Sequence, residues 1–244
     1  RKSLRSFASD NNSGVHPLVM DALQRANEDH ALGYGSDKWT DEAVAMLKES
    51  FTPACESLFV FNGTGSNIVA LQLMVRPFHS IICAETAHIY VDECGSPVKN
   101  TGAQIRPVLT PDGKLTPELI RPYLHGFGDQ HHSQPGAIYL SQCTELGTVY
   151  TPVELKALTS LAHEHGMYVH MDGARIANAC AYLKTSLKEI TADCGIDVLS
   201  FGGTKNGLMM GECVVIFNEE LKASAAFVRK QSAQLASKMR YLSC

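Results

Sequence analysis

Short apolar runs rich in β-branched and aromatic residues alternate along this chain with longer segments in which apolar residues recur every three or four positions. The short runs predict buried strands, and the longer segments predict amphipathic helices. Because the two alternate, we expect an α/β fold with a mostly parallel central sheet flanked by helices. The predicted strands are 57–61, 80–83, 137–141, 168–171, 198–201 and 212–217.

Several helix boundaries can also be read from the sequence. Thr151-Pro152-Val153-Glu154 combines an N-cap with a proline in the first turn, and Gly166 stops the apolar pattern that follows. The segment 115–118 opens a second helix in the same way. The apolar pattern of 221–241 predicts a further helix, because no glycine or proline interrupts it.

Composition narrows the possible partners. The chain has 244 residues, of which 45% are apolar and 19% charged, enough for one large α/β domain. The net charge of -4 and the lack of a basic stripe argue against nucleic acid and membrane partners and favour a small molecule. The eight cysteines are scattered singly, no apolar run reaches the roughly 18 residues of a membrane-spanning helix, and no leader pattern is seen, so we expect a reduced, cytoplasmic protein.

Lys205 is the most informative single residue. It lies in the uncharged, glycine-rich loop 200–207, directly after a predicted strand. A lysine held among small residues loses hydration, which favours its neutral amine, and neutral lysine amines form Schiff bases. The alternative interpretation is an ordinary lysine in a surface turn.

The segment 61–67 connects a predicted strand to an apolar helix pattern through Gly63, Thr64 and Gly65. Such a turn presents free backbone N–H groups and the positive end of a helix to an anion. No Gly-Lys-Ser/Thr follows, and the third glycine of the dinucleotide fingerprint is missing. A phosphate site remains possible, and a simple tight turn is the alternative.

Two further side chains follow predicted strands. Asp172 ends an apolar strand at the edge where α/β folds place their sites, although it could instead cap the next helix. His88 also follows a strand, where a single histidine is often structural. A zinc site from His163, His165 and His170 is the least favoured alternative, because the first two point to different faces of a helix.

Together these residues match the requirements of pyridoxal phosphate. This cofactor needs a lysine, a carboxylate at the pyridine nitrogen, a phosphate site and a flat partner for its ring. Lys205, Asp172, the turn 63–65 and His88 supply one each, in the chain order of fold type I pyridoxal enzymes.

The chain resembles a known family, the low-specificity threonine aldolases of the β-eliminating lyase superfamily. The resemblance covers nearly the whole sequence, and its most specific segments are HMDGAR at 170–175 and GGTKNG at 202–207. Further matching segments are 7–11, 33–37, 61–67 and 85–88.

The resemblance implies a fold type I large domain at 31–244 after an N-terminal segment 1–30. It also implies a small C-terminal domain that is missing from this chain. The same resemblance implies a homodimer or homotetramer, with sites at the subunit interface.

The implied activity is pyridoxal phosphate-dependent cleavage of L-threonine or L-allo-threonine, and of related 3-hydroxy amino acids, to glycine and an aldehyde. Lys205, His88 and Asp172 would be catalytic, with His88 stacked on the cofactor ring and acting as the base. Arg175 would lie beside the cofactor, or could instead form a structural ion pair with Asp172. The remaining implied contacts are Gly63, Thr64, Gly65 and Thr204 to the cofactor, and Ser9, Tyr34 and Arg175 to the substrate.

Alternative functions stay open. The same scaffold could serve a β-eliminating lyase or a phenylserine-type aldolase, and the chain could be a truncated, non-catalytic remnant. The remnant hypothesis rests on an arginine that grips the substrate carboxylate in relatives and that is expected beyond Cys244. In addition, the segment 141–145 lacks the second active-site histidine of some relatives.

Overall fold

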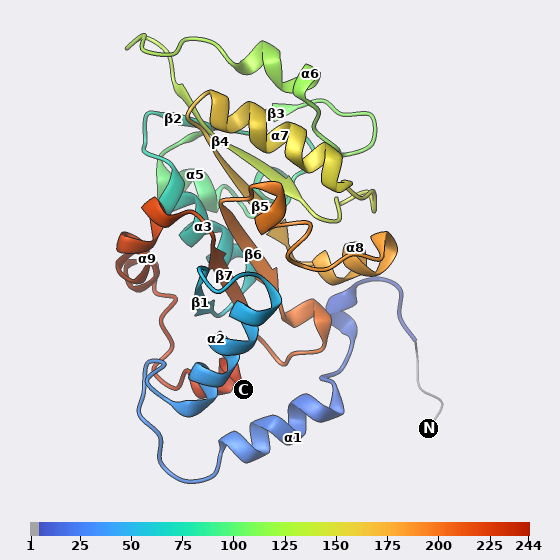
Figure 1. Cartoon of the computed structure of the whole chain (residues 1–244), viewed down its shortest axis with the longest axis vertical. Helices are drawn as coiled ribbons and strands as arrows, with labels where there is room; N and C mark the ends of the chain where they lie inside the picture. The colour runs from blue at the N-terminus through green and yellow to red at the C-terminus, as the bar shows by residue number, and fades with distance from the viewer. Residues whose placement is uncertain (1–4) are drawn as a thin grey trace.

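The computed structural model describes residues 5–244 and is built on one seven-stranded sheet (Figure 1). The strand order is β1-β7-β6-β5-β4-β2-β3, and β7 runs antiparallel to both of its neighbours whereas the other pairs are parallel. The expected α/β fold with a mostly parallel sheet is therefore confirmed. The strands are β1 (Glu56–Val60), β2 (His79–Ala84), β3 (Gln104–Val108), β4 (Gln134–Ser141), β5 (Tyr168–Gly173), β6 (Val198–Gly202) and β7 (Glu212–Ile216).

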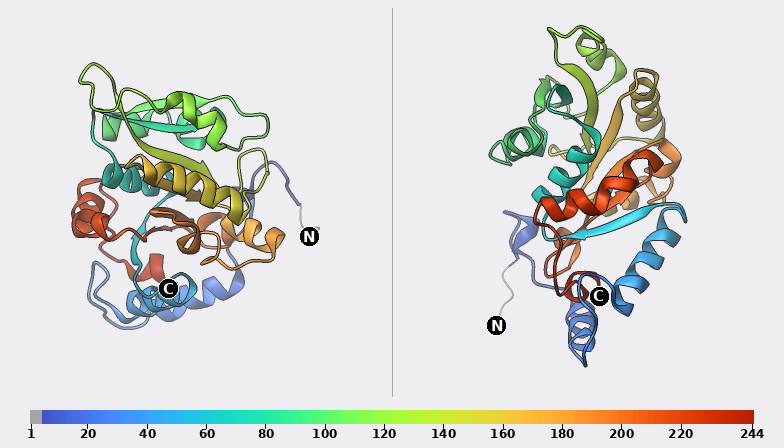
Figure 2. Two further views of the ribbon diagram at one scale, coloured as in Figure 1. Left: turned by 45° about the horizontal axis from the view of Figure 1, so that its top comes forward. Right: turned by 90° about the vertical axis from the view of Figure 1, so that its left-hand side faces the viewer.

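Helices cover both faces of the sheet (Figure 2). On one face α3 (Gly63–Met74) packs on β5, β6 and β7, with α5 (Ser96–Thr101) and α9 (Glu219–Gln231) against it. On the other face lie α2 (Lys38–Ser50), α7 (Pro152–Glu164) and α8 (Ile176–Leu183). Each face buries its own apolar cluster, which is why the strands read as nearly continuous apolar runs. The shorter helices are α4 (His88–Val91), α6 (Pro117–Ile120) and α10 (Arg240–Ser243).

Local signals in the sequence set several of these boundaries. Thr151 and Glu154 form a reciprocal capping box at the start of α7. Asn62 caps α3, because its side chain accepts a hydrogen bond from the N–H of Gly65. Thr116 caps α6, which ends after four residues and continues as a 3₁₀ turn at Arg121–Tyr123.

Two features differ from the sequence-based expectation. Strand β3 was not predicted, because Pro107 interrupts its pattern and an edge strand has only one neighbour to pair with. The prediction of a single helix over 221–241 is wrong. Helix α9 ends at Gln231, Ala233 adopts a left-handed backbone with φ of 58°, and α10 begins only at Arg240.

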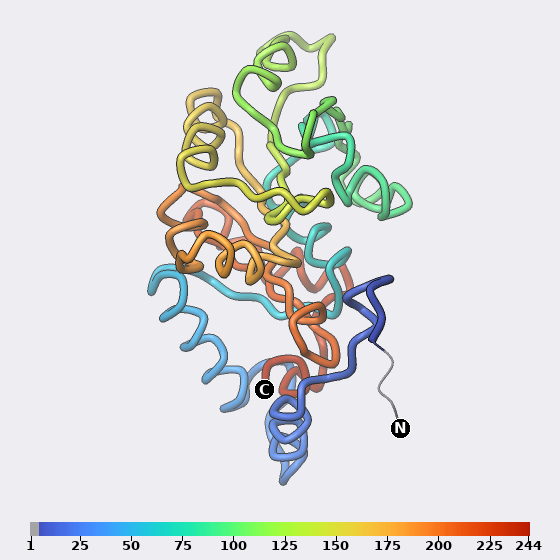
Figure 3. The backbone as a smooth tube through the Cα atoms, turned by 90° about the vertical axis from the view of Figure 1, so that its right-hand side faces the viewer, coloured from blue at the N-terminus to red at the C-terminus, as the bar shows by residue number. Residues whose placement is uncertain are grey.

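Residues 5–16 cross the side of the molecule and pass close to the turn that follows β6 (Figure 3). The 3₁₀ turn η1 (Asp10–Asn12) contacts the turn η4 (Thr204–Asn206), and the N–H of His16 donates to the carbonyl of Gly207 at 2.9 Å. Helix α1 (Pro17–Ala26) follows, with Leu18 and Met20 exposed. The division into an N-terminal segment 1–30 and a domain 31–244 stays a prediction. Among the described residues, no helix combines the length and apolar character needed to cross a membrane.

Candidate active site

A cavity of about 230 Å³ opens at the carboxyl edge of the parallel strands. This is the edge at which open α/β sheets bind their ligands. Its walls come from segments far apart in the sequence, brought together because β1, β2, β4, β5 and β6 all end there and β7 begins there. The lining residues are Asn11, Asn62, Gly63, Thr64, Asn67, His88, Ser141, Cys143, Glu145, Asp172, Ala174, Arg175, Thr204, Lys205 and Glu212.

Asp172 lies near the end of β5 and is buried. Tyr139 Oη donates to its Oδ2 at 2.6 Å, Asn67 Nδ2 donates to the same oxygen at 3.0 Å, and the N–H of Ala174 donates to Oδ1 at 3.0 Å. Burial raises the pKa of Asp172, but these hydrogen bonds outweigh it, so the pKa lies below its ordinary value. The side chain is therefore a buried carboxylate. It is not the N-cap of α8, a position that Arg175 occupies.

His88 begins α4, directly after β2. Its Nδ1 lies 2.8 Å from Oε1 of Glu93, and its backbone N–H donates to Oε1 of Glu145 at 2.9 Å. The hydrogen bond to Glu93 raises the pKa of His88, burial lowers it, and the net effect is a raised pKa. The ring is thus tied to a buried carboxyl on one side and borders the cavity.

Lys205 sits in η4, the turn that follows β6. The path of the turn depends on glycine: a Cβ on Gly202 would lie 2.6 Å from backbone atoms of Ala174, and one on Gly203 would lie 2.6 Å from the carbonyl of Gly211. Glu212 accepts the N–H of Gly203 at 2.7 Å, and burial raises the pKa of this carboxyl. Close packing and Glu212 therefore place the lysine at the cavity wall.

The N-terminus of α3 supplies backbone donors to the same cavity. Gly63 and Thr64 line it, and their N–H groups have no intrahelical acceptor at this position in a helix. Gly65 differs, because its N–H donates to Asn62 Oδ1 at 2.8 Å and the side chain of Gln234 lies against its Cα. Of the three predicted residues, Gly65 is the one that does not reach the cavity wall.

Arg175 lines the cavity and pairs with Asp10. Its Nε donates to Asp10 Oδ2 at 2.6 Å and its Nη2 to Oδ1 at 3.2 Å. The alternative of a structural pair with Asp172 is therefore wrong, because the acid it contacts comes from η1. Ser9 accepts the N–H of Asn11 at 3.2 Å and does not line the cavity, whereas Asn11 does.

Tyr34 is also outside this cavity. Its side chain is 58% exposed, its φ is 61°, and its N–H donates to the carbonyl of Ser237 at 2.9 Å. Within one chain the structure therefore does not bring Tyr34 together with Lys205 and Asp172.

The three histidines of the zinc alternative have separate partners. His163 contacts Asp197 at 2.9 Å, His165 contacts the carbonyl of Leu161 at 2.9 Å, and fully buried His170 contacts Asn67 at 3.0 Å. Burial lowers the pKa of His170 to about 4. The chain thus uses these residues in three different places.

Sequence reasoning missed several polar residues at the site. Asn67, Glu93 and Tyr139 are buried and contact His88 or Asp172, while Glu145 and Glu212 line the cavity. For all of them except Glu93, the only available signal was their position in a segment already singled out; Glu93 lies outside those segments. Nothing in the sequence indicated which of them would be turned inward.

Comparisons with known proteins agree with this geometry. The model of the family described as beta-eliminating lyase matches residues 6–242. A low specificity L-threonine aldolase of Pseudomonas aeruginosa is 45% identical over 239 residues, covering 98% of this chain and 69% of the relative. A protein of the same name from Saccharomyces cerevisiae is 36% identical over 179 residues, covering 70% of this chain and 44% of that protein.

Among solved structures, threonine aldolase from Leishmania major superposes with a TM-score of 0.92 at 33% identity. That match covers 98% of this chain and 70% of the other. An aspartate aminotransferase variant of Thermus thermophilus gives a TM-score of 0.67 at 17% identity and shares the fold alone; it covers 94% of this chain and 64% of the other. With a family model that spans almost the whole sequence and relatives this similar, the chain belongs to the beta-eliminating lyase family.

Proposed function

We propose that this protein is a pyridoxal phosphate-dependent lyase that cleaves L-threonine or L-allo-threonine, and related 3-hydroxy amino acids, to glycine and an aldehyde. The observation that carries the proposal is that Lys205, Asp172 and His88 line one cavity at the carboxyl edge of the sheet. The names of its relatives support the same assignment.

The residues present fit the cofactor. Asp172 is a buried carboxylate whose hydrogen-bond partners among residues 5–244 include no cationic side chain, which suits a protonated pyridine nitrogen. Gly63 and Thr64 direct free N–H groups and a helix N-terminus to the cavity, as a phosphate requires. When bound, pyridoxal phosphate acts as an electron sink for the bonds at the substrate Cα.

Each residue of the site has a distinct role in this proposal. Lys205 would hold the cofactor through its side-chain amine. Asp172 stabilises the positive charge at the pyridine nitrogen. His88 accepts the proton of the substrate β-hydroxyl as the bond between Cα and Cβ breaks. Arg175, held by Asp10, would orient bound groups from the cavity wall, and Thr204 lines the same wall next to Lys205.

Roles for Ser9 and Tyr34 at the substrate stay proposals. Ser9 caps the turn that carries Asp10 and Asn11 to the cavity, so it would act on the substrate through that turn. Tyr34 would reach a site only in a neighbouring copy of the chain.

We also propose that the chain works as a homodimer or homotetramer in the cytoplasm. Exposed apolar side chains at a groove beside α1, namely Met20, Phe61, Met209 and Met210, favour self-association. The eight free cysteines suit a reducing compartment. Sedimentation at several concentrations should give the mass of a dimer or tetramer, and a monomer at all concentrations would contradict this.

Product analysis tests the reaction. Incubation with L-threonine and pyridoxal phosphate should release glycine and acetaldehyde in equal amounts, because the bond broken lies between Cα and Cβ. A keto acid with ammonia would instead show β-elimination. Phenylserine provides the comparison, since glycine with benzaldehyde is the expected product pair from a site that tolerates a larger aldehyde. Failure to release any product would remove the proposal.

A further inference from the structure

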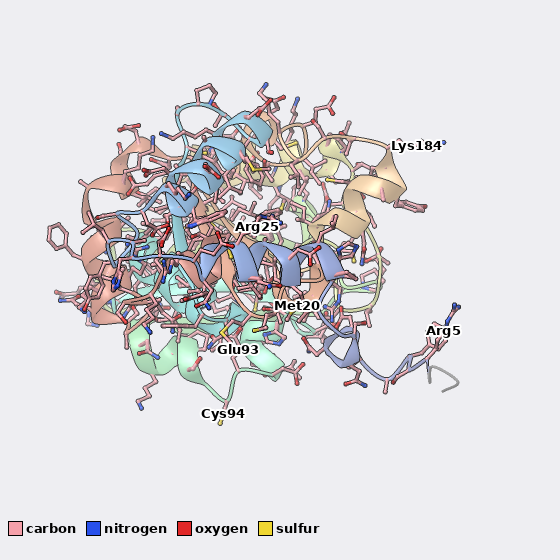
Figure 4. All side chains as sticks on the ribbon, turned by 90° about the horizontal axis from the view of Figure 1, so that it is seen from below. Arg5, Met20, Arg25, Glu93, Cys94 and Lys184 are labelled. Atoms are coloured by element: carbon pink, nitrogen blue, oxygen red, sulfur yellow. The ribbon has the colours of Figure 1, made fainter. Side chains whose placement is uncertain are left out.

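Glu93 is a buried carboxyl group next to the cavity that the mechanism above leaves without a role. It lies between α4 and α5, and its side chain is 0% exposed, compared with 35% for that of His88. The adjacent Cys94 is exposed and points outward (Figure 4). Burying a carboxylate is expensive, so the contacts of Glu93 should explain its position.

These contacts determine which nitrogen of His88 can accept a proton. Oε1 of Glu93 lies 2.8 Å from His88 Nδ1, and the same oxygen accepts a hydrogen bond from Asn67 Nδ2 at 2.8 Å. An ionised carboxylate can only accept, so Nδ1 carries the hydrogen when the imidazole is neutral. The free lone pair of the ring then lies on Nε2.

Asn67 connects Glu93 to Asp172. Its Nδ2 also donates to Asp172 Oδ2 at 3.0 Å, while its Oδ1 accepts a hydrogen bond from Ser200 Oγ at 3.0 Å. Because the oxygen is occupied by a hydroxyl donor, the amide NH₂ faces the two carboxyl groups. Asn67 is 1% exposed, so this one amide holds both acids in fixed positions.

We propose that Glu93 is a positioning residue for aldol cleavage, acting through His88. It holds the imidazole as the Nδ1–H tautomer and leaves Nε2 to accept the substrate proton, while Asn67 keeps Glu93 aligned with Asp172. This inference rests on the proposed role of His88. Oε2 of Glu93 is buried and has no hydrogen-bond partner among residues 5–244, so the side-chain contacts to His88 and Asn67 both fall on Oε1.

The charges around His88 set the direction of the pH effect. The hydrogen bond that His88 donates to Glu93 raises the pKa of His88 against the effect of burial; Asp172 raises this pKa further, and Lys205 lowers it. Glu145, which binds the backbone N–H of His88, and Arg175 line the same cavity. Because His88 must be unprotonated to act as a base, activity should fall as the pH decreases through a pKa above 6.5.

The unmodified protein offers the first test. Histidine ¹⁵N chemical shifts, with the His88 signals assigned by their absence in His88→Gln, report which nitrogen carries the hydrogen. Above the pKa of His88 we expect a protonated Nδ1 and a bare Nε2. A neutral ring protonated on Nε2 would overturn the proposal, and this measurement needs no Glu93 variant and no catalysis.

Glu93→Gln is the second test. Loss of the negative charge should lower the pKa of His88 by about one unit and move the acid limb of kcat/KM to lower pH by a similar amount. The maximum kcat should fall about 10- to 100-fold, the size of the loss when a carboxylate behind a metal-binding histidine is removed, with KM changed much less. A His88 pKa and tautomer identical to those of the wild type would contradict the proposal.

Asp197→Asn provides a matched control. Asp197 is also a buried carboxyl beside a histidine, 2.9 Å from His163 Nε2, with its side chain 5% exposed, and it does not line the cavity. Its replacement should leave the titration of His88 unchanged, whatever its effect on stability. If the wild type releases no aldehyde, the proposed function fails, whereas the NMR measurements still decide whether Glu93 controls His88.

Discussion

Replacement of Lys205 by alanine should abolish aldehyde release, with a loss of four or more orders of magnitude in kcat. Alanine removes the only amine placed in the cavity wall by η4, and removing a covalent catalytic group typically has an effect of this size. The absorbance band near the visible edge that we expect for the protein with bound pyridoxal phosphate should disappear with it. Absorbance spectra and progress curves at saturating threonine measure both effects.

The fold should survive this substitution. Lys205 is only half-buried, and the path of its turn depends on the glycines rather than on the lysine side chain. Lys156→Ala, on the exposed face of α7, is the matched control and should retain both the band and the activity. If Lys205→Ala kept more than a few per cent of wild-type activity, the assignment of this lysine would be wrong.

Asp172→Asn should reduce kcat by roughly a thousandfold or more, comparable to the loss when an orienting aspartate is replaced by its amide in other enzymes. The variant loses the charge that stabilises the pyridine nitrogen. It also places an amide NH₂ against at least one of the donors from Tyr139, Asn67 and Ala174, which leaves polar groups unpaired at about 1–3 kcal/mol. Steady-state kinetics and urea unfolding measure the two effects.

The sign of the pH dependence follows from the pKa of Asp172, which is depressed below 3.8 in the folded protein. Such a group contributes stability above its unfolded pKa, and this contribution is lost as the pH falls towards the folded value. The stability difference between wild type and Asp172→Asn should therefore be largest at neutral pH and shrink below about pH 4. Asp193→Asn, a surface control paired with Lys188, should show neither the kinetic loss nor this pH-dependent difference. A full-activity Asp172→Asn variant would exclude the proposed role of the carboxylate.

Much of the architecture could be predicted because it is encoded locally. The apolar runs of β4 to β7 and the cap at Thr151 identify their elements without tertiary information. Strand β3 could not be predicted, because an edge strand that contains Pro107 lacks the apolar pattern of a buried strand. The end of α9 could not be predicted either, because the left-handed backbone that follows it is at Ala233, and alanine ordinarily favours a helix.

The contacts of the candidate site could also be predicted only in part. Lys205, Asp172 and His88 follow strands, and the carboxyl ends of parallel strands meet at one edge, so their proximity could be inferred from topology. The ion pair between Arg175 and Asp10 could not, because it joins residues 165 positions apart. The contact of Glu93 with His88 could not be predicted either, because it depends on the path of the turn between α4 and α5 and on the amide of Asn67 in α3.

The central claim is that this cavity binds pyridoxal phosphate through Lys205. Borohydride reduction of the protein incubated with the cofactor, followed by peptide mass spectrometry, makes that bond permanent and locates it. We expect one modified lysine, Lys205, in a stoichiometric amount, and no modification at that position in Lys205→Ala. Modification at a different lysine, or only scattered modification of surface lysines, would contradict it.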